Sequence, residues 1–318
     1  MKIYLLLAFF CFCSAAAISQ PSPKWQSKLD TNYIQVLAAK WSLRFHTISK
    51  YDQFTVSGPG YAASFKPDVK IAFGIGASYK NLAIDLGLNL ISSDPEHKSK
   101  NLALLSSMYM GANVIEIFAQ KYQNYTVQVY NVNDEPIVDQ FRTDIRTYNF
   151  GINYHYSFNH RRFSFDAASL GTQVQKRSAG TPLVGGYLSY FNLTADSAIL
   201  SSNYANSDAQ ITRANLFAGG ISAGYAYFFV LPAHFYVMLS LTPKLGLNGG
   251  NIKSTEDKQI PISVSPGFLT RNAIGYSSKK FYGFLSALID YDMGSTGSNN
   301  TFSYDPVKIK LLVGYRFD

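Results

Sequence analysis

Apolar and polar residues alternate along much of this chain with a period of two. Between residues 69 and 79 the odd positions are apolar or aromatic, and the even positions are small or polar. A two-residue joint at Lys80 and Asn81 leads into a second alternating stretch, from Leu82 to Leu90. A period of two is typical of β-strands whose two faces differ, and two strands joined by two residues form a hairpin.

The same alternation returns at residues 148–158, 217–229, 235–247 and 307–317. After the first of these, a short polar turn at residues 159–162 leads into a further alternating stretch that begins with Phe163 and Phe165. Soluble antiparallel sheets also alternate, but these strands run to about 9 to 13 residues, the length that a tilted strand needs to cross a bilayer. Aromatic residues lie near the strand ends, as in the interfacial girdles of membrane barrels. The opposite face carries Gly, Ala, Ser and Asn, so we expect a polar lumen and no dry core.

The pattern therefore predicts an all-β fold, a closed antiparallel transmembrane β-barrel of about 12–14 strands. The strand number depends on residues 173–215, where Leu183–Thr194 is one strand and Ser197–Ser202 is a candidate for another. We expect short periplasmic turns at residues 80–81, 111–113, 159–162, 231–234 and 278–280. We expect longer extracellular loops at residues 92–100, 126–146, 249–261 and 292–305.

The N-terminus has the pattern of a secretory signal peptide. Lys2 precedes an apolar run from Ile3 to Phe12, and small residues follow. The run is too short for a membrane helix, which needs roughly 20 residues. Cleavage after Ala17 or after Ser19 would each leave small residues at the positions that a signal peptidase reads. We favour Ser19, which divides the chain into a signal peptide (1–19), an N-terminal periplasmic segment (20–38) and an outer-membrane barrel (39–318).

Composition removes several classes of function. Both cysteines, Cys11 and Cys13, lie in the signal peptide, so the mature chain has no disulfide, thiol nucleophile or cysteine metal site. The chain has 28 basic and 20 acidic residues, and loss of Lys2 lowers the net charge from +8 to +7. No run of five basic residues occurs, and export argues against a nucleic-acid partner.

Three segments resemble a known family: "YAASFKPDVKIAFGIGASYKNLAIDLGLNL", "RTDIRTYNFGINYHYSFNHRRFSFDAASLGTQVQKRSAGTPLVGGYLSYFNL" and "GGISAGYAYFFVLPAHFYVMLSLTPKLGLN". They are similar to a Bacteroidetes outer-membrane family known as domain of unknown function 4421. The resemblance extends from about Asp30 to the end of the chain. It implies a barrel in the outer membrane and brings no activity or functional residue with it.

Candidate chemistry is sparse, and we expect no enzyme, no cofactor and no metal site. The five histidines lack the HxH and HExxH spacings of metal sites. His155 and Ser157 share one strand face, but residues i and i+2 lie about 7 Å apart. That distance is too long for a catalytic hydrogen bond.

Charged residues at inward positions are the remaining candidates for a functional site. The alternation places eight of them on the lumen face: Lys70, Asp85, Lys244, Arg271, Asp290, Lys308, Lys310 and Arg316. They form either salt-bridged struts or a basic passage for anionic solutes.

Three classes of function remain open. The first is a pore or transporter for small solutes, anionic ones included. The alternatives are a structural or surface-interaction barrel that binds an external partner through its loops, and an outer-membrane lipid enzyme, for which the sequence offers no polar cluster at the membrane edge. The last strand ends on Phe317 before Asp318, similar to the signal read by the barrel-assembly machinery, so we expect that machinery and outer-membrane lipid as partners.

Overall fold

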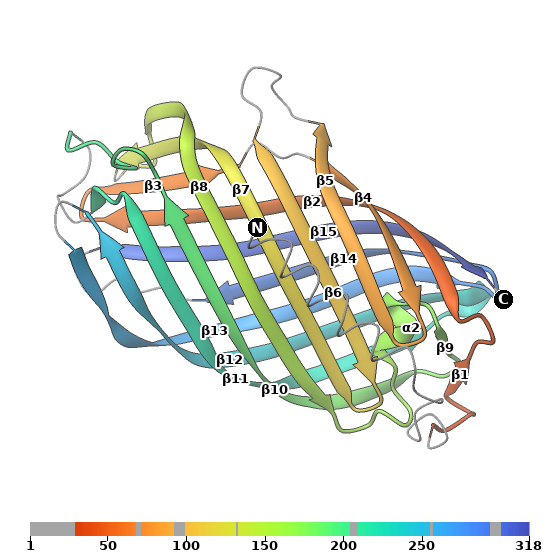
Figure 1. The fold of residues 1–318 in the computed structure, drawn as a ribbon. Coiled ribbons are helices and arrows are strands. Elements are labelled where there is room, and N and C mark those ends of the chain that lie inside the picture. Colours follow the sequence, from red (N-terminus) through yellow and green to blue (C-terminus); the bar gives the residue numbers. More distant parts are fainter. Residues whose placement is uncertain are drawn as a thin grey trace, which may run out of the picture.

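The computed structural model describes residues 29–67, 71–91, 99–131, 133–203, 209–254, 257–292 and 300–317. It is a β-barrel with 12 antiparallel strands in its ring (Figure 1). In order around the ring these are β2 (Trp41–Gly58), β4 (Ile71–Tyr79), β5 (Leu82–Ile91), β6 (Lys100–Met110), β7 (Asn113–Asn131), β8 (Pro136–Ser157), β10 (Ala179–Thr194), β11 (Arg213–Val230), β12 (Phe235–Lys253), β13 (Asp257–Ser277), β14 (Phe281–Asp292) and β15 (Thr301–Phe317).

Pairing of the last strand with the first closes the ring. β15 pairs with β2 from Phe317 opposite Trp41 to Thr301 opposite Ser57. The predicted barrel is confirmed with the lower strand number, and Ser197–Ser202 forms no strand. Closure leaves no free sheet edge across this pairing, as a membrane-spanning sheet requires.

The strands fall into two length groups. β4, β5 and β6 have 9, 10 and 11 residues, whereas β7, β8, β12 and β13 have 19 to 22. Past the short strands, β3 (Tyr61–Lys66) pairs with β2 on one side and β7 on the other. The wall there passes from β2 to β7 through one strand instead of three, and the long strands continue beyond the length that a bilayer requires.

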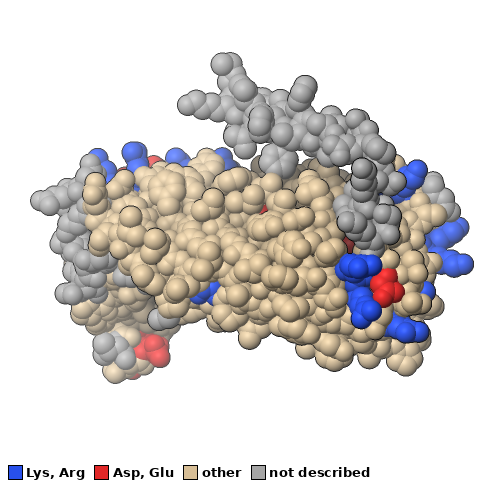
Figure 2. All heavy atoms as spheres, turned by 90° about the horizontal axis from the view of Figure 1, so that it is seen from below, with Lys and Arg blue, Asp and Glu red and all other residues tan. Residues whose placement is uncertain are grey.

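The outer face carries an apolar band between two polar zones. On β8, Phe150 and Tyr154 are exposed while Asn149, Asn153 and His155 between and beside them are buried inside the barrel. Figure 2 shows Lys and Arg gathered near the two ends of the barrel, with a wall between them that is largely uncharged. Large apolar side chains exposed to this extent are expected where a wall faces lipid.

Two of the predicted long loops are strands, so those predictions are wrong. Residues 126–131 and 136–146 belong to β7 and β8, and residues 249–253 and 257–261 belong to β12 and β13. Their outward faces are polar because they lie beyond the apolar band, which gives them the composition of a loop. Their inward faces stay apolar and buried, as at Val127, Val129, Ile145, Ile252 and Ile260. Residues 92–98 and 293–299 of the other two predicted loops lie outside the described residues.

Four of the predicted short turns are present, and we call their end of the barrel the turn end. The turns predicted at 80–81 and 278–280 have those bounds, and those predicted at 111–113 and 231–234 are each one residue shorter, at 111–112 and 232–234. The opposite end is the loop end. The pattern predicted that the turn at residues 159–162 leads directly into a strand, and this prediction is wrong. The turn leads into residues 163–178, a segment that we call the plug, which contains α2 (Phe165–Ser169) and β9 (Gln173–Gln175).

The plug lies at the turn end, near the C-terminus of the chain (Figure 1). β9 pairs there with β1 (Ile34–Val36), the strand that precedes the ring. The predicted signal peptide and Lys70 lie outside the described residues.

Candidate functional site: the closed lumen

The turn end of the lumen is filled by apolar side chains of the plug. Phe163, Phe165 and Leu170 are buried against Phe228 and Leu312 of the wall. These residues explain why the pattern suggested a strand here, since Phe163 and Phe165 alternate with polar neighbours. Ser164 instead caps the N-terminus of α2 by accepting a hydrogen bond from the Ala167 amide at 3.0 Å, a preferred role for serine.

Asp166 holds the chain as it leaves α2. Its carboxylate accepts hydrogen bonds from the Thr172 amide at 2.9 Å, the Thr172 hydroxyl at 2.6 Å and the Gln173 amide at 2.9 Å. Burial raises the pKa of Asp166 to about 6, although these hydrogen bonds act in the opposite direction. Asp166 therefore binds a proton more tightly when the plug is folded than when it is unfolded.

Three wall side chains donate hydrogen bonds to carbonyls at the C-terminal end of α2. Tyr236 Oη donates to Ala168 O at 3.1 Å, Arg44 donates to Ser169 O at 3.1 Å, and Arg316 Nε donates to Gly171 O. Carbonyls at a helix end have no partner within the helix, and positive charge is favourable there. The wall thus holds the plug through backbone atoms.

A charged network crosses the lumen next to the plug. The Asp85 carboxylate binds Arg44, with Nε 3.0 Å from Oδ1, and also the Lys310 ammonium at 2.6 Å. The side chains come from β5, β2 and β15, and all three are largely withdrawn from solvent. Because Arg44 also holds the plug, this network joins three wall strands to the closure of the turn end.

Two further ion pairs connect strands that are not neighbours in the ring. Arg271 on β13 donates to Glu116 on β7, with Nε 3.0 Å from Oε2. Lys244 on β12 binds Asp290 on β14, and its ammonium lies 4.5 Å from the centre of the Tyr187 ring. Arg271 and Lys244 therefore each have an acidic partner inside the barrel.

The structure places the described members of the predicted set inside the barrel. Asp85, Lys244, Arg271 and Arg316 are buried, Asp290 and Lys310 form the ion pairs above, and the Lys308 ammonium lies 4.9 Å from the centre of the inward Phe118 ring. The sequence reasoning missed Arg44 and Glu116, although the alternation in Ser42, Arg44 and His46 and in Val114, Glu116 and Phe118 contained the signal. It also missed the plug.

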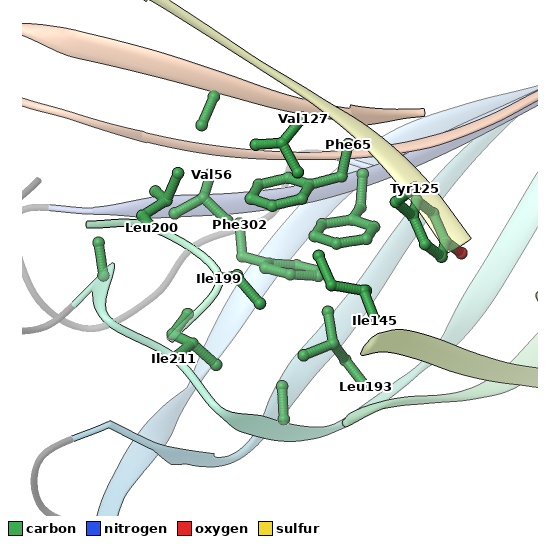
Figure 3. Packing of buried hydrophobic residues seen from close by; sticks show 14 of the residues in the cluster. Val56, Phe65, Tyr125, Val127, Ile145, Leu193, Ile199, Leu200, Ile211 and Phe302 are labelled. Carbon is green, nitrogen blue, oxygen red and sulfur yellow. The ribbon is translucent and has the colours of Figure 1, made fainter. Parts of the chain in front are cut away.

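The loop end is closed by a second apolar cluster (Figure 3). Phe54 stacks on Phe65 with ring centres 4.3 Å apart, and it lies 5.5 Å from the Phe302 ring. Ile199 and Ile211, from the segment between β10 and β11, are buried in the same cluster. The expectation that the inward face lacks large apolar residues is therefore wrong at both ends of the lumen.

An arginine–aspartate pair fixes the segment between β10 and β11 over this cluster. Arg142 Nε lies 2.7 Å from Asp144 Oδ1, and Arg142 also donates to Ala198 O at 2.9 Å. Asp144 in turn accepts hydrogen bonds from the amides of Asp196 and Ser197 at 3.1 and 3.3 Å. Residues 196–198 are thereby held to β8.

Two small cavities lie inside the described part of the barrel. One cavity of about 130 Å³ lies among Arg44, Asp85, Glu116, Arg271 and Lys310. Another cavity, of about 100 Å³, lies nearer the loop end and is lined by Asn, Asp and aromatic side chains. Both are well below the roughly 300 to 1,000 Å³ of ordinary ligand pockets.

His155 and Ser157 each have a different partner inside the barrel. His155 Nε2 lies 3.3 Å from the Ser222 hydroxyl, and the Ser157 hydroxyl lies 3.0 Å from that of Thr181. In the part of the chain that the structure describes, no group of three His, Cys, Asp or Glu is placed to hold a metal ion.

The ring, its apolar outer band and its inward charges define the class: a transmembrane β-barrel of the outer-membrane type. More particularly, the chain belongs to the family described as domain of unknown function DUF4421, which matches residues 28–317. Among curated proteins, none matches the sequence.

Solved outer-membrane barrels resemble the chain at low identity. The outer membrane protease OmpT from Escherichia coli is 7% identical with a TM-score of 0.39, covering 89% of this chain and 99% of its own. The transport unit of the autotransporter AIDA-I from Escherichia coli is 11% identical with a TM-score of 0.35, covering 87% and 90%. The outer membrane protein OprG from Pseudomonas aeruginosa is 13% identical with a TM-score of 0.27, covering 91% and 99%. TM-scores this low add nothing to the strand pairing.

Proposed function

We propose that this protein is a closed outer-membrane barrel that acts through its surface, as a structural or surface-interaction protein. The observation that carries the proposal is that the lumen is filled at both ends, by the plug at the turn end and by the Phe54 cluster at the loop end. The long strands support it, because they carry a sheet well past the apolar band and offer an outer surface to a partner. We propose no catalytic role.

Single-channel recording tests this proposal. The mature protein, refolded and inserted into a planar lipid bilayer, should show no steady conductance at low voltage. Insertion is verified separately by protease protection and by the fraction of the protein that floats with liposomes. Steady ohmic channels from verified insertions would overturn the proposal.

We further propose that the chain is exported to the outer membrane of a Gram-negative bacterium, with its turn end in the periplasm. The signal-peptide pattern supports export, and the final strand ending at Phe317 supports insertion by the barrel-assembly machinery. The mature chain should begin near Gln20 and fractionate with the outer membrane. N-terminal sequencing that returns Met1, or recovery in the soluble fraction, would contradict this assignment.

A gated passage for small solutes is the second candidate, favoured by the charged middle of the lumen. Such a channel would conduct only after displacement of the plug and of the segment between β10 and β11. Lys308 and Lys310 lie two residues apart on the closing strand, so the open state should prefer anions. A reversal potential under a salt gradient measures this preference, and charge reversal of both lysines should weaken it.

A further inference from the structure

Four cations gather on the outer face of the barrel, where the short strands end. Lys100 on β6 lies opposite Gln123 on β7, and Gln123 lies opposite Arg146 on β8. Lys121 lies two residues before Gln123 on β7, nearer the turn end. Lys66 on β3 lies opposite Thr126 of β7, nearer the loop end. We call Lys66, Lys100, Lys121 and Arg146 the cationic rim. These residues come from neighbouring strands of one part of the wall.

The cationic rim borders directly on the apolar band. Leu102 lies opposite Lys121 across the β6–β7 pairing and is about half exposed. Tyr148 lies opposite Lys121 on the other side, and the ammonium is 5.3 Å from the centre of its ring. Phe150, the next outward residue of β8, is also exposed. A cation held over an aromatic ring at the edge of an apolar wall is placed at the level of lipid headgroups.

Acidic side chains close to the rim neutralise little of its charge. Asp196 lies 3.7 Å from Arg146, but both are solvent-exposed, with 71% and 44% of their side-chain surfaces accessible. An exposed pair of this kind is weak. Asp144, the nearest outward acid on β8, is bound through both of its oxygens to Arg142 at 2.7 Å. Lys66 donates to Gln128 at 3.3 Å, and Gln128 in turn donates to Asp139, so that acid reaches the rim only indirectly. Among the residues described here, the rim therefore keeps most of its positive charge.

We infer that the cationic rim binds the phosphate of a phosphorylated membrane lipid, whose acyl chains lie along the apolar wall below. Arginine and lysine bind phosphate oxygens through charge-assisted hydrogen bonds, and such bonds are screened less at the bilayer surface than in open water. A free phosphate would gain nothing from Leu102 and Phe150. The lipid gains from both parts of the site.

The inference goes beyond the proposed function, since it concerns the lipid-facing side of the wall and not the lumen or an external protein. It holds for a closed barrel and for a gated one. A bound lipid at this position would also lie beside Lys100, the first residue of β6, near the place where the wall changes from three strands to one.

Native mass spectrometry of the full mature chain in detergent tests the inference with three probes. These are phosphatidic acid, diacylglycerol with the same acyl chains, and glycerol phosphate, which has no acyl chain. We expect phosphatidic acid to bind at least tenfold more tightly than either of the others. Equal binding of glycerol phosphate would identify a free-phosphate site and overturn the lipid assignment, and equal binding of diacylglycerol would overturn the role of the phosphate.

The variant K100Q/R146Q should weaken phosphatidic acid binding by about tenfold or more, since about 1.4 kcal/mol corresponds to a factor of ten. The matched control is R213Q/K253Q, which removes two exposed cations that lie opposite each other on β11 and β12, farther from the apolar band. The control should change affinity less than threefold. Equal losses in the two variants would show nonspecific attraction and overturn the site. Circular dichroism and the heat-dependent gel mobility of folded barrels confirm that each variant is folded.

Discussion

Gly76 on β4 lies directly opposite Asp85 on β5, and a Cβ atom at Gly76 would overlap the Asp85 carboxylate. The missing side chain therefore leaves the space in which Asp85 reaches Arg44 and Lys310. Gly87 lies two residues after Asp85 on β5 and on the same inward face, and it has open space where its Cβ would be. Two glycines that are both flanked by apolar residues and both face the lumen thus have different roles.

Gly76→Ala should destabilise the barrel by about 3 kcal/mol or more, because it displaces Asp85 from two buried cations. Gly87→Ala should cost less than about 1 kcal/mol. Urea unfolding of each variant in lipid vesicles measures the difference in the free energy of unfolding. Equal losses at the two positions would show that Asp85 is not held in this way.

Leu86 lies between Asp85 and Gly87 on β5 and points outward, with 46% of its surface exposed. Leu86→Arg places a charge in the apolar band and should cost about 2 to 4 kcal/mol of barrel stability. Gly87→Ser, on the lumen side, should cost far less, since the space is open. The same unfolding assay applies, and a larger loss for Gly87→Ser would contradict the assignment of the two faces.

The plug should become less stable as the pH rises. Burial raises the pKa of Asp166 to about 6 in the folded plug, from an ordinary value of 3.8. The folded state therefore binds the proton more tightly than the unfolded state, and its contribution is complete below about pH 4 and lost as the pH rises through 6. A shift of this size corresponds to about 3 kcal/mol.

Hydrogen exchange at residues 163–176, corrected for the intrinsic dependence of exchange on pH, measures this effect. Protection should fall between pH 4 and pH 6.5 in the native protein and should change much less in Asp166→Asn. Protection that increases with pH over this range would mean that the carboxylate, held by its three hydrogen bonds, is the favoured form.

The plug and the Phe54 cluster should each be sufficient by itself to prevent conductance through the barrel. Replacement of residues 163–176 by a short flexible linker removes the plug but leaves the stacked rings of Phe54, Phe65 and Phe302, so the barrel should still not conduct. Conductance should appear only when the replacement is combined with Phe54→Ala and Phe302→Ala. Channels after loss of the plug alone would show that the apolar cluster does not close the loop end.

The sequence by itself determined the faces of the strands. A period of two fixes which side chains share a side, because successive residues of a strand point in opposite directions. That is why Asp85, Lys244, Lys310 and Arg316 were assigned to the lumen without knowledge of the fold. The short turn at Lys80 and Asn81 was equally visible, since a hairpin of two residues is a local structure.

Only the tertiary structure decided what these residues contact and where the lumen is filled. Arg44 meets Asp85 because the pairings of β2 with β4 and of β4 with β5 place both residues opposite Gly76. Ring closure brings β15, with Lys310, beside β2, and the local pattern encodes neither these registers nor the position of the plug. The alternation also cannot distinguish a strand from a chain that folds back inside the barrel, as Phe163 and Phe165 do. Burial in the lumen is decided by what the closed wall surrounds, and that depends on all of its strands at once.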